Sequence, residues 1–130
     1  MCEFCDIANG TKSAYYVLRK ETHVAFLDMG PINEGHVLIV PKLHADSIVG
    51  IPTDLLVDIF DSAREIVNAL TKTYGNRGYT IMQNGGENCD FGHFHLHVFP
   101  RYKDDGFGWT DSGIAHEYTQ AVADKLAANL

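Results

Sequence analysis

Short apolar runs separated by polar turns predict that the first third of this chain forms β-strands. Residues 15–19 and 23–27 are rich in aromatic and β-branched side chains and flank three polar residues, a pattern typical of a hairpin. A turn over residues 31–35 leads into a continuous apolar run, 36–40, that stops at a proline. A run without alternation indicates a strand buried on both faces.

Helical periodicity is clearest over residues 52–74, where apolar side chains recur every three or four positions. Thr53 is the expected N-cap of this helix and Gly75 its expected C-terminal stop. The apolar stripe consists of Leu55, Leu56, Ile59, Phe60, Ala63, Ile66, Val67 and Leu70.

Shorter elements flank this helix. Residues 3–9 predict about two helical turns ending at a glycine, and residues 116–130 predict a C-terminal helix. Residues 79–83 predict a strand, and a polar, glycine-containing loop over 84–92 follows it. This order predicts an α+β domain in which the long helix packs on one face of an antiparallel sheet. The whole chain, 1–130, is expected to form a single domain.

The strand after this loop carries the strongest chemical signal. Residues 93–99 read His-Phe-His-Leu-His-Val-Phe, so His93, His95 and His97 alternate with apolar residues. Successive side chains of a strand point to opposite faces, which places three imidazoles on one face and an apolar row on the other. Imidazole can ligate a metal, move a proton or attack phosphorus near neutral pH. A shared metal site and a catalytic site are both open interpretations.

Charge and cysteine content narrow the class of protein. The net charge of −7 argues against a general nucleic-acid surface, because such proteins usually carry a basic stripe. No apolar run approaches the roughly 20 residues that a membrane span needs, and the N-terminus has no pattern of a signal peptide. An odd number of cysteines, three, fits a reducing compartment better than a disulfide scaffold. We therefore expect a cytoplasmic protein without a nucleic-acid or membrane partner.

Several motifs agree in order and spacing with one known family. The histidine strand over 93–99 is preceded by Phe-Leu-Asp at 26–28 and by Gly-His-Val-Leu-Ile-Val-Pro-Lys-x-His at 35–44. The chain thereby resembles the histidine-triad (HIT) superfamily of nucleotide-binding proteins, and Cys-x-x-Cys at 2–5 and Gly-Phe-Gly at 106–108 resemble its zinc-containing bacterial branch. The resemblance implies a HIT-like fold, with a five- to six-stranded antiparallel sheet, one long helix and short terminal helices.

The resemblance also implies nucleotidyl chemistry. His95 would attack the α-phosphorus of a nucleoside phosphoramidate, polyphosphate or adenylate, and water would release a nucleoside monophosphate from the resulting nucleotidyl-histidine. Its other ring nitrogen must donate to an acceptor that fixes the tautomer, and a backbone carbonyl near His36 on the neighbouring strand is the expected acceptor. His97, about 7 Å away along the strand, would contact a phosphate oxygen or orient the leaving group.

A purine nucleotide such as AMP is the implied ligand, as substrate or product. Phe26 and Met29 would line its base pocket, Asp28 would accept from the ribose hydroxyls, and Asn84 with the amides of residues 85–92 would hold phosphate oxygens. Other roles are open for two of these: Phe26 as a core residue, and Asp28 as the cap of the following turn.

One residue departs from the family pattern. Three positions before the first triad histidine, members commonly carry Ser, Thr or Gln near the phosphate, whereas this chain has Asp90. A carboxylate beside a phosphate is repulsive unless it is protonated or turned away. Either Asn88 fills the role or turnover is slow, so a nucleotide-binding signalling module with little or no turnover is the alternative function.

Four residues form a candidate metal site. In the bacterial branch, Cys2, Cys5, His44 and His93 correspond to zinc ligands, which would leave His95 free for chemistry. Two cysteines this close are otherwise buried thiols. A zinc-dependent hydrolase is a third functional interpretation, but it requires an open coordination position that a closed set of four ligands lacks.

Other reactive residues lack a partner pattern. Cys89 is interpreted as incidental, and His23 and His116 as surface residues. Lys42 and Arg101 are candidates for attracting phosphate, although charged residues at strand ends are usually only solvated.

The resemblance further implies a homodimer in which the long helix and an edge strand meet their mates. The apolar stripe of the helix fits this arrangement but fits burial within one subunit equally well. In such a dimer we expect residues 107–109 to reach toward the site of the partner.

Overall fold

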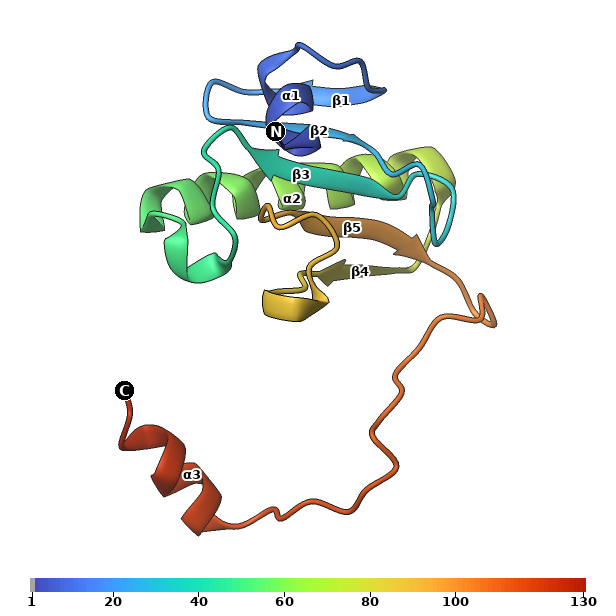
Figure 1. The fold of residues 1–130 in the computed structure, drawn as a ribbon. Helices are drawn as coiled ribbons and strands as arrows, with labels where there is room; N and C mark the ends of the chain where they lie inside the picture. Colours follow the sequence, from blue (N-terminus) through green and yellow to red (C-terminus); the bar gives the residue numbers. More distant parts are fainter. Residues whose placement is uncertain (1) are drawn as a thin grey trace.

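The computed structural model describes residues 2–130 and consists of a five-stranded antiparallel sheet with a helix on each face and a C-terminal tail (Figure 1). The strand order is β1-β2-β3-β5-β4. This confirms the predicted α+β class and the packing of one long helix on the sheet. The strands are β1 (Tyr16–Arg19), β2 (His23–Leu27), β3 (Val37–Pro41), β4 (Gly78–Met82) and β5 (Leu96–Arg101); the helices are α1 (Glu3–Asn9), α2 (Thr53–Tyr74) and α3 (Gln120–Ala127), with short 3₁₀ turns at Ile48–Gly50 and Gly86–Asn88.

Two apolar clusters lie on opposite faces of the sheet. Helix α2 covers one face, and its apolar stripe packs against residues of β2, β3 and β5. Helix α1 covers part of the other face, where Phe4, Ile7 and Ala8 pack against Val24 and Phe26 of β2 and against β3. Strand β3 is buried along its whole length because it lies between both helices, as its unbroken apolar sequence predicts.

The ends of α2 follow local sequence signals only in part. Gly75 has φ 66° and ends the helix in the left-handed conformation, as predicted. Thr53 is already the first helical residue, and the N-cap is Pro52, so the expected side-chain cap is wrong by one position. Proline fixes its own φ near the value that a helix entry tolerates, which moves the boundary back by one residue. Phe60, on the predicted stripe, is 46% exposed.

The turn at residues 31–35 needs a glycine at its end. Gly35 has φ 88°, and a Cβ placed there would lie 2.6 Å from Cε2 of Tyr74 at the end of α2. A side chain at this position would therefore meet both backbone strain and a clash. This close approach anchors the loop between β2 and β3, which carries two of the candidate site residues.

Strand β5 begins at Leu96, three residues later than the histidine alternation predicts. The ladder with β3 starts at the pair Ile39↔Leu96, and the amide of Phe94 instead donates to the carbonyl of Ala45 at 2.7 Å. The facing of the side chains is nevertheless as predicted. Phe94 joins the apolar cluster under α2, whereas His95 faces the α1 side of the sheet.

The interpretation of His23 as a surface residue is wrong. Its side chain is 2% exposed, and its Nε2 lies 2.7 Å from Oγ of Ser62 on α2 while its Nδ1 lies 3.0 Å from Oγ1 of Thr22. These hydroxyls satisfy both ring nitrogens, and burial lowers the pKa of His23.

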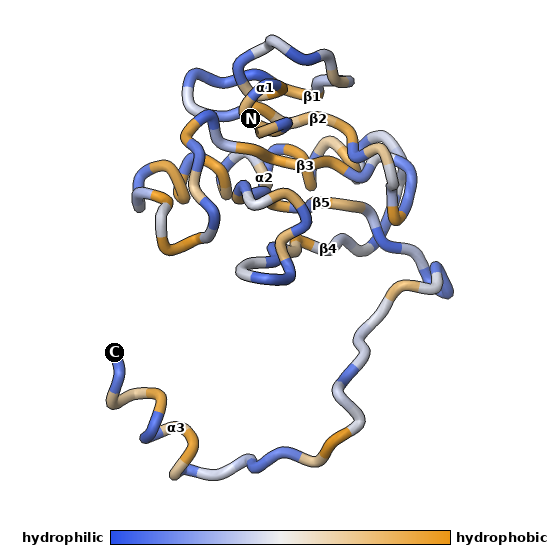
Figure 2. Tube along the Cα trace, viewed as in Figure 1, coloured by the Kyte–Doolittle hydropathy of each residue, from blue (hydrophilic) through white to orange (hydrophobic). Residues whose placement is uncertain are grey.

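The C-terminal segment leaves the body of the molecule after β5 and carries α3 away from the sheet (Figure 1). Helix α3 is shorter than the predicted 116–130, because Thr119 caps it by accepting a hydrogen bond from the amide of Val122. None of its described residues is buried, although apolar positions recur along the tail (Figure 2). Within residues 2–130, no helix has the length and apolar character required to cross a membrane.

Candidate functional site

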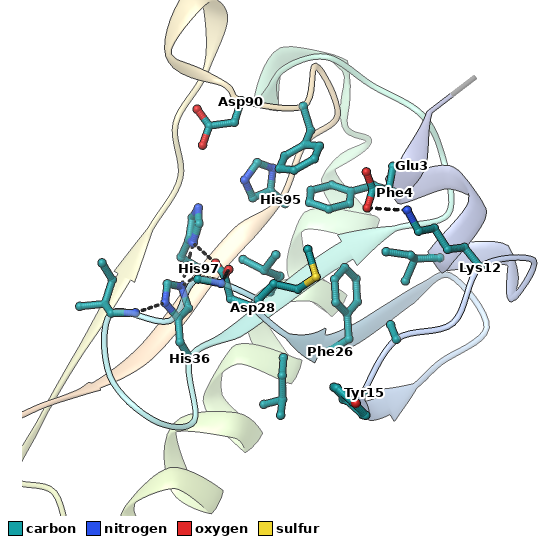
Figure 3. Close-up of a pocket in the computed structure, with 18 of the residues that line it drawn as sticks. Glu3, Phe4, Lys12, Tyr15, Phe26, Asp28, His36, Asp90, His95 and His97 are labelled. Carbon is teal, nitrogen blue, oxygen red and sulfur yellow. Dashed lines mark hydrogen bonds and ion pairs between the residues drawn. The ribbon is translucent and has the colours of Figure 1, made fainter.

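A cavity of about 620 Å³ opens on the α1 side of the sheet (Figure 3). Helix α1, the end of β2, the loop from 28 to 36, the loop before β5 and β5 itself all contribute to its wall. The cavity therefore joins segments that are far apart in the sequence. The sequence-predicted catalytic and substrate-binding residues all line it: Phe26, Asp28, Met29, His36, Asn84, Asp90, His95 and His97.

His95 is oriented by the residue two positions before it. Its Nδ1 lies 2.9 Å from the carbonyl oxygen of His93, and because a carbonyl only accepts, Nδ1 carries the proton. In the neutral ring this tautomer leaves the lone pair on Nε2, the nitrogen that can act as a nucleophile. The expected acceptor, a carbonyl near His36 on the neighbouring strand, is wrong. His95 precedes β5, where the chain bends and its own backbone supplies the acceptor.

A directional hydrogen-bond chain fixes the proton positions of His36 and His97. The amide of Ile32 donates to Nδ1 of His36 at 3.0 Å, so His36 carries its proton on Nε2. That Nε2 donates to Nδ1 of His97 at 2.9 Å. His97 therefore has its proton on Nε2, where it can serve as a donor.

Burial lowers the pKa values of the two imidazoles in this hydrogen-bond chain, those of His36 and His97. For His97 the pKa falls to about 4 because of burial and because of the neighbouring rings of His95 and His36. For His36 burial also lowers the pKa, and the carboxylate of Asp28 partly opposes the effect. Both rings are thus neutral at pH 7. The ring centroids of His95 and His97 are 4.9 Å apart, closer than the pleat of a regular strand predicts.

Asp28 divides its two oxygens between the turn and the histidines. Oδ1 accepts from the amide of Gly30 at 2.8 Å, as expected of a turn cap. Oδ2 lies 3.5 Å from Nε2 of His36 and 3.8 Å from Nδ1 of His97. These three side chains are close enough to hold a metal ion. However, the amide of Ile32 keeps the proton of His36 on the nitrogen that would have to ligate, so the cluster fits a hydrogen-bond relay better than a metal site.

Cys2, Cys5, His44 and His93 converge beside the cavity, and their donor atoms all lie within 4.8 Å of one another. Nδ1 of His93 is 3.3 Å from Sγ of Cys2, 3.4 Å from Sγ of Cys5 and 3.2 Å from Nδ1 of His44. The other nitrogen, Nε2 of His93, donates to the carbonyl of Pro41 at 2.9 Å, which leaves Nδ1 free to ligate.

The geometry of this cluster fits tetrahedral zinc. Zn–N and Zn–S bonds of about 2.0 to 2.3 Å imply donor separations of roughly 3.3 to 3.8 Å in a tetrahedron. Nε2 of His44 also lies 3.2 Å from the carboxylate of Asp46, an outer contact that orients a ligating imidazole. Cys89 is not part of the cluster; its thiol lies 3.7 Å from the carbonyl of His93.

Sequence reasoning missed the aromatic wall of the cavity. Phe4 of α1 stacks on Phe91 with centroids 4.4 Å apart and meets the edge of His95 at 5.1 Å. Glu3 and Lys12 form an ion pair of 2.8 Å at the same wall. No motif marks these residues, because packing of α1 against the sheet brings them in. The position of Phe4 between two candidate metal ligands was the available signal.

The remaining candidates lie outside the cavity wall. Arg101 is held by Asp105 through contacts of 2.7 and 2.9 Å and also donates to the carbonyl of Phe107, so it stabilises the turn after β5. Lys42 does not line this cavity. Asp90 lines it and Asn88 does not.

A family model and a curated relative match most of this chain. The model of the HIT domain family matches residues 9–104. A relative named adenosine 5′-monophosphoramidase, from Candida albicans, is 31% identical over 139 aligned positions, which cover 99% of this chain and 91% of the relative.

Two solved structures extend the comparison to the fold. A HIT family protein from Bacillus anthracis superposes with a TM-score of 0.87 at 32% identity and covers 99% of this chain and 96% of its own. A zinc-bound histidine triad family protein from Mycobacterium smegmatis superposes with a TM-score of 0.77 at 27% identity, covering 87% of this chain and 84% of its own.

Proposed function

The chain belongs to the HIT domain family, and from this premise we propose that it cleaves nucleoside phosphoramidates, polyphosphates or adenylates through a nucleotidyl intermediate on His95. The observation that carries the proposal is the arrangement of two imidazole tautomers with opposite proton positions in one cavity. His95 presents an unprotonated Nε2 and His97 a protonated one. The name of the Candida albicans relative, a monophosphoramidase, supports the same chemistry.

The reaction balances in two steps. Nε2 of His95 attacks phosphorus, the bond from phosphorus to the leaving nitrogen or oxygen breaks, and the leaving group takes the electron pair and a proton from solvent. The imidazolium formed on His95 is stabilised by its Nδ1–H bond to the carbonyl of His93. Water then attacks phosphorus, the bond to His95 breaks with its electron pair returning to Nε2, and the proton taken up in the first step is released. His97 donates from Nε2 to a non-bridging phosphate oxygen throughout.

The nucleotide would lie along the cavity as an AMP-like ligand. Phe26 and Met29 would contact the base, the Oδ2 atom of Asp28 would accept from the ribose, and Asn84 would contact phosphate. His36 would act through His97, whose tautomer it sets. The cavity volume of about 620 Å³ suits a ligand of this size.

A trapping experiment tests the intermediate. Protein mixed with adenosine 5′-phosphoramidate and quenched within the first turnovers should carry one adenosine monophosphoryl group on the peptide that contains His95, detected by mass spectrometry. His95→Ala should lose both the adduct and turnover while still binding AMP. His116→Ala is the matched control, because His116 is exposed and, among residues 2–130, its hydrogen-bond partner is Ser112. Full turnover by His95→Ala, or an adduct on another residue, would refute the proposal.

A second candidate function is a nucleotide-binding module with little or no turnover. The observation in its favour is Asp90, whose carboxylate lines the cavity close to the position proposed for phosphate. Under this alternative, AMP binds with the same affinity but no adduct accumulates on His95.

We also propose that Cys2, Cys5, His44 and His93 hold a structural zinc ion, as in the zinc-containing bacterial branch. The ion would fix α1 against the loop before β5, and no step of the chemistry passes through it. The donor separations and the outer contacts of both histidines support this.

Assembly and location complete the proposal. We propose a homodimer of single-domain chains in the cytoplasm. Within residues 2–130, Cys2, Cys5 and Cys89 form no disulfide, which fits a reducing compartment. Exposed apolar residues on α2, Val57 and Phe60, offer a surface for a second copy.

A further inference from the structure

The proposed nucleotide cavity is acidic. Three carboxylates line it, those of Glu3, Asp28 and Asp90, against a single ammonium, that of Lys12. Lys12 is already paired with Glu3 at 2.8 Å, and the histidines that line the cavity and have lowered pKa values, His36 and His97, are neutral at pH 7. A phosphate therefore enters a cavity whose described lining offers it no unpaired lysine or arginine.

Asp90 differs from the other two carboxylates. Glu3 is bound to Lys12, and Asp28 is bound to the amide of Gly30. Among residues 2–130, no hydrogen bond or ion pair engages the side chain of Asp90, which is solvent-exposed. Its charge nevertheless acts on His97, so it lies within electrostatic range of the phosphate position.

The position of Asp90 along the cavity indicates what it would contact. Figure 3 shows Asp90 on the far side of His95 and His97 from Asp28 and Phe26. If the base and ribose lie at Phe26 and Asp28 and the phosphorus lies at the histidines, the remaining group attached to phosphorus extends toward Asp90. That group is the leaving group.

From this arrangement we propose that Asp90 binds a cationic leaving group, so that the substrates are nucleoside 5′-phosphoramidates or adenylates whose leaving group carries an ammonium. This inference rests on the proposed function and specifies its substrate class. A substrate of this kind supplies the cation that the cavity lacks. The ammonium pairs with the carboxylate of Asp90 and offsets its repulsion of the phosphate. A neutral leaving group leaves that repulsion uncompensated.

Two substrates of equal length test the inference. Adenosine 5′-phosphoramidates of 1,5-diaminopentane and of hexylamine differ only in a terminal ammonium in place of a methyl group. We expect kcat/KM of the wild-type protein to favour the ammonium compound by about 2- to 5-fold, the range of an ion pair at a solvent-exposed carboxylate. The preference should shrink as salt is added.

Two variants separate a local contact from the general charge of the protein. Asp90→Asn should bring the preference close to one, lowering kcat/KM for the ammonium compound and raising it for the hexyl compound. Glu87→Gln removes the same charge from an exposed residue of the same loop that does not line the cavity, and it should keep the wild-type preference. A wild-type preference near one, or an equal loss in both variants, would overturn the inference.

Binding distinguishes failure of the inference from failure of the proposed function. Calorimetry of both compounds with His95→Ala gives the same comparison without turnover. Tighter binding of the ammonium compound that disappears in the double variant with Asp90→Asn supports the role of Asp90, even if the wild-type protein cleaves neither compound and the proposed function is wrong. Equal binding of both compounds contradicts the inference, whatever the turnover.

Discussion

At the scale of single residues, the proton positions in the cavity begin at backbone groups. The amide of Ile32 sets the tautomer of His36 and, through it, that of His97, whereas the carbonyl of His93 sets that of His95. Backbone groups cannot change protonation state, so they favour the same tautomers whenever the rings are neutral. Neither backbone contact was predictable from the alternation of histidines. The contact of Ile32 depends on the loop between β2 and β3, and that of His93 depends on the bend before β5.

The lowered pKa of His97 makes stability depend on pH. The pKa falls from 6.5 in the unfolded chain to about 4 in the fold, so the unfolded chain binds an extra proton between these values. The contribution of His97 is complete above pH 6.5 and is lost as pH falls toward 4. The free energy of unfolding is measured with urea at pH 7.5 and at pH 4.5. We expect its decrease between these two pH values to be about 2 kcal/mol smaller in His97→Gln than in wild type. His116→Gln should show the same decrease as wild type. A decrease in His97→Gln as large as that of wild type would contradict this account.

At the scale of elements, α1 is too short to be stable alone. A helix of seven residues does not form in isolation, so its place depends on tertiary contacts. Phe4, Ile7 and Ala8 supply packing, and the proposed zinc ligands Cys2 and Cys5 flank the first turn. Because the same helix forms one wall of the cavity, the proposed zinc site and the proposed nucleotide site share a structural element.

Metal removal should therefore loosen α1. We expect about one equivalent of zinc in protein prepared without chelator, and a loss of about 3 kcal/mol of stability when chelation removes a ligand present at 100 times its Kd. Cys5→Ser should lose zinc and the same stability. Cys89→Ser is the matched control and should keep its zinc, since Cys89 lies outside the ligand set. A zinc content below about a tenth of an equivalent per chain, in protein whose thiols are intact, would refute the zinc proposal.

Elements with strong local signals were predictable, and those fixed by distant contacts were not. The apolar run at 36–40 and the glycine at 75 gave β3 and the end of α2 because burial and left-handed backbone act locally. The start of β5 depends on an amide of Phe94 that bonds to Ala45, far away in the sequence. His23 is buried only because α2 supplies Ser62 across the sheet.

At the scale of the whole molecule, the main apolar cluster and the candidate site lie on opposite faces of the sheet. Helix α2 and its apolar cluster occupy one face, and the cavity with its histidines occupies the other. Phe107 still packs against Phe99 of β5, and the tail beyond it leaves the sheet (Figure 1). Its large side chains are uncovered, with Trp109 and Tyr118 fully exposed and Ile114 69% exposed. Apolar side chains spaced along an extended arm are suited to contact another molecule.

The proposed homodimer gives this arm a binding surface. We expect sedimentation equilibrium to give twice the chain mass. We also expect a chain truncated after Asp105 to change its preference between neutral and ammonium leaving groups, because residues 107–109 would then no longer reach the partner's site. Truncation after Thr119 removes only α3 and keeps residues 107–109, so it should keep the preference. Asp105 and its contacts with Arg101 remain in both truncated chains, whereas truncation after Asp105 removes the carbonyl of Phe107 that accepts from Arg101, so thermal unfolding of both truncated chains is the folding control. An unchanged preference after truncation at Asp105 would show that the arm does not act at the site.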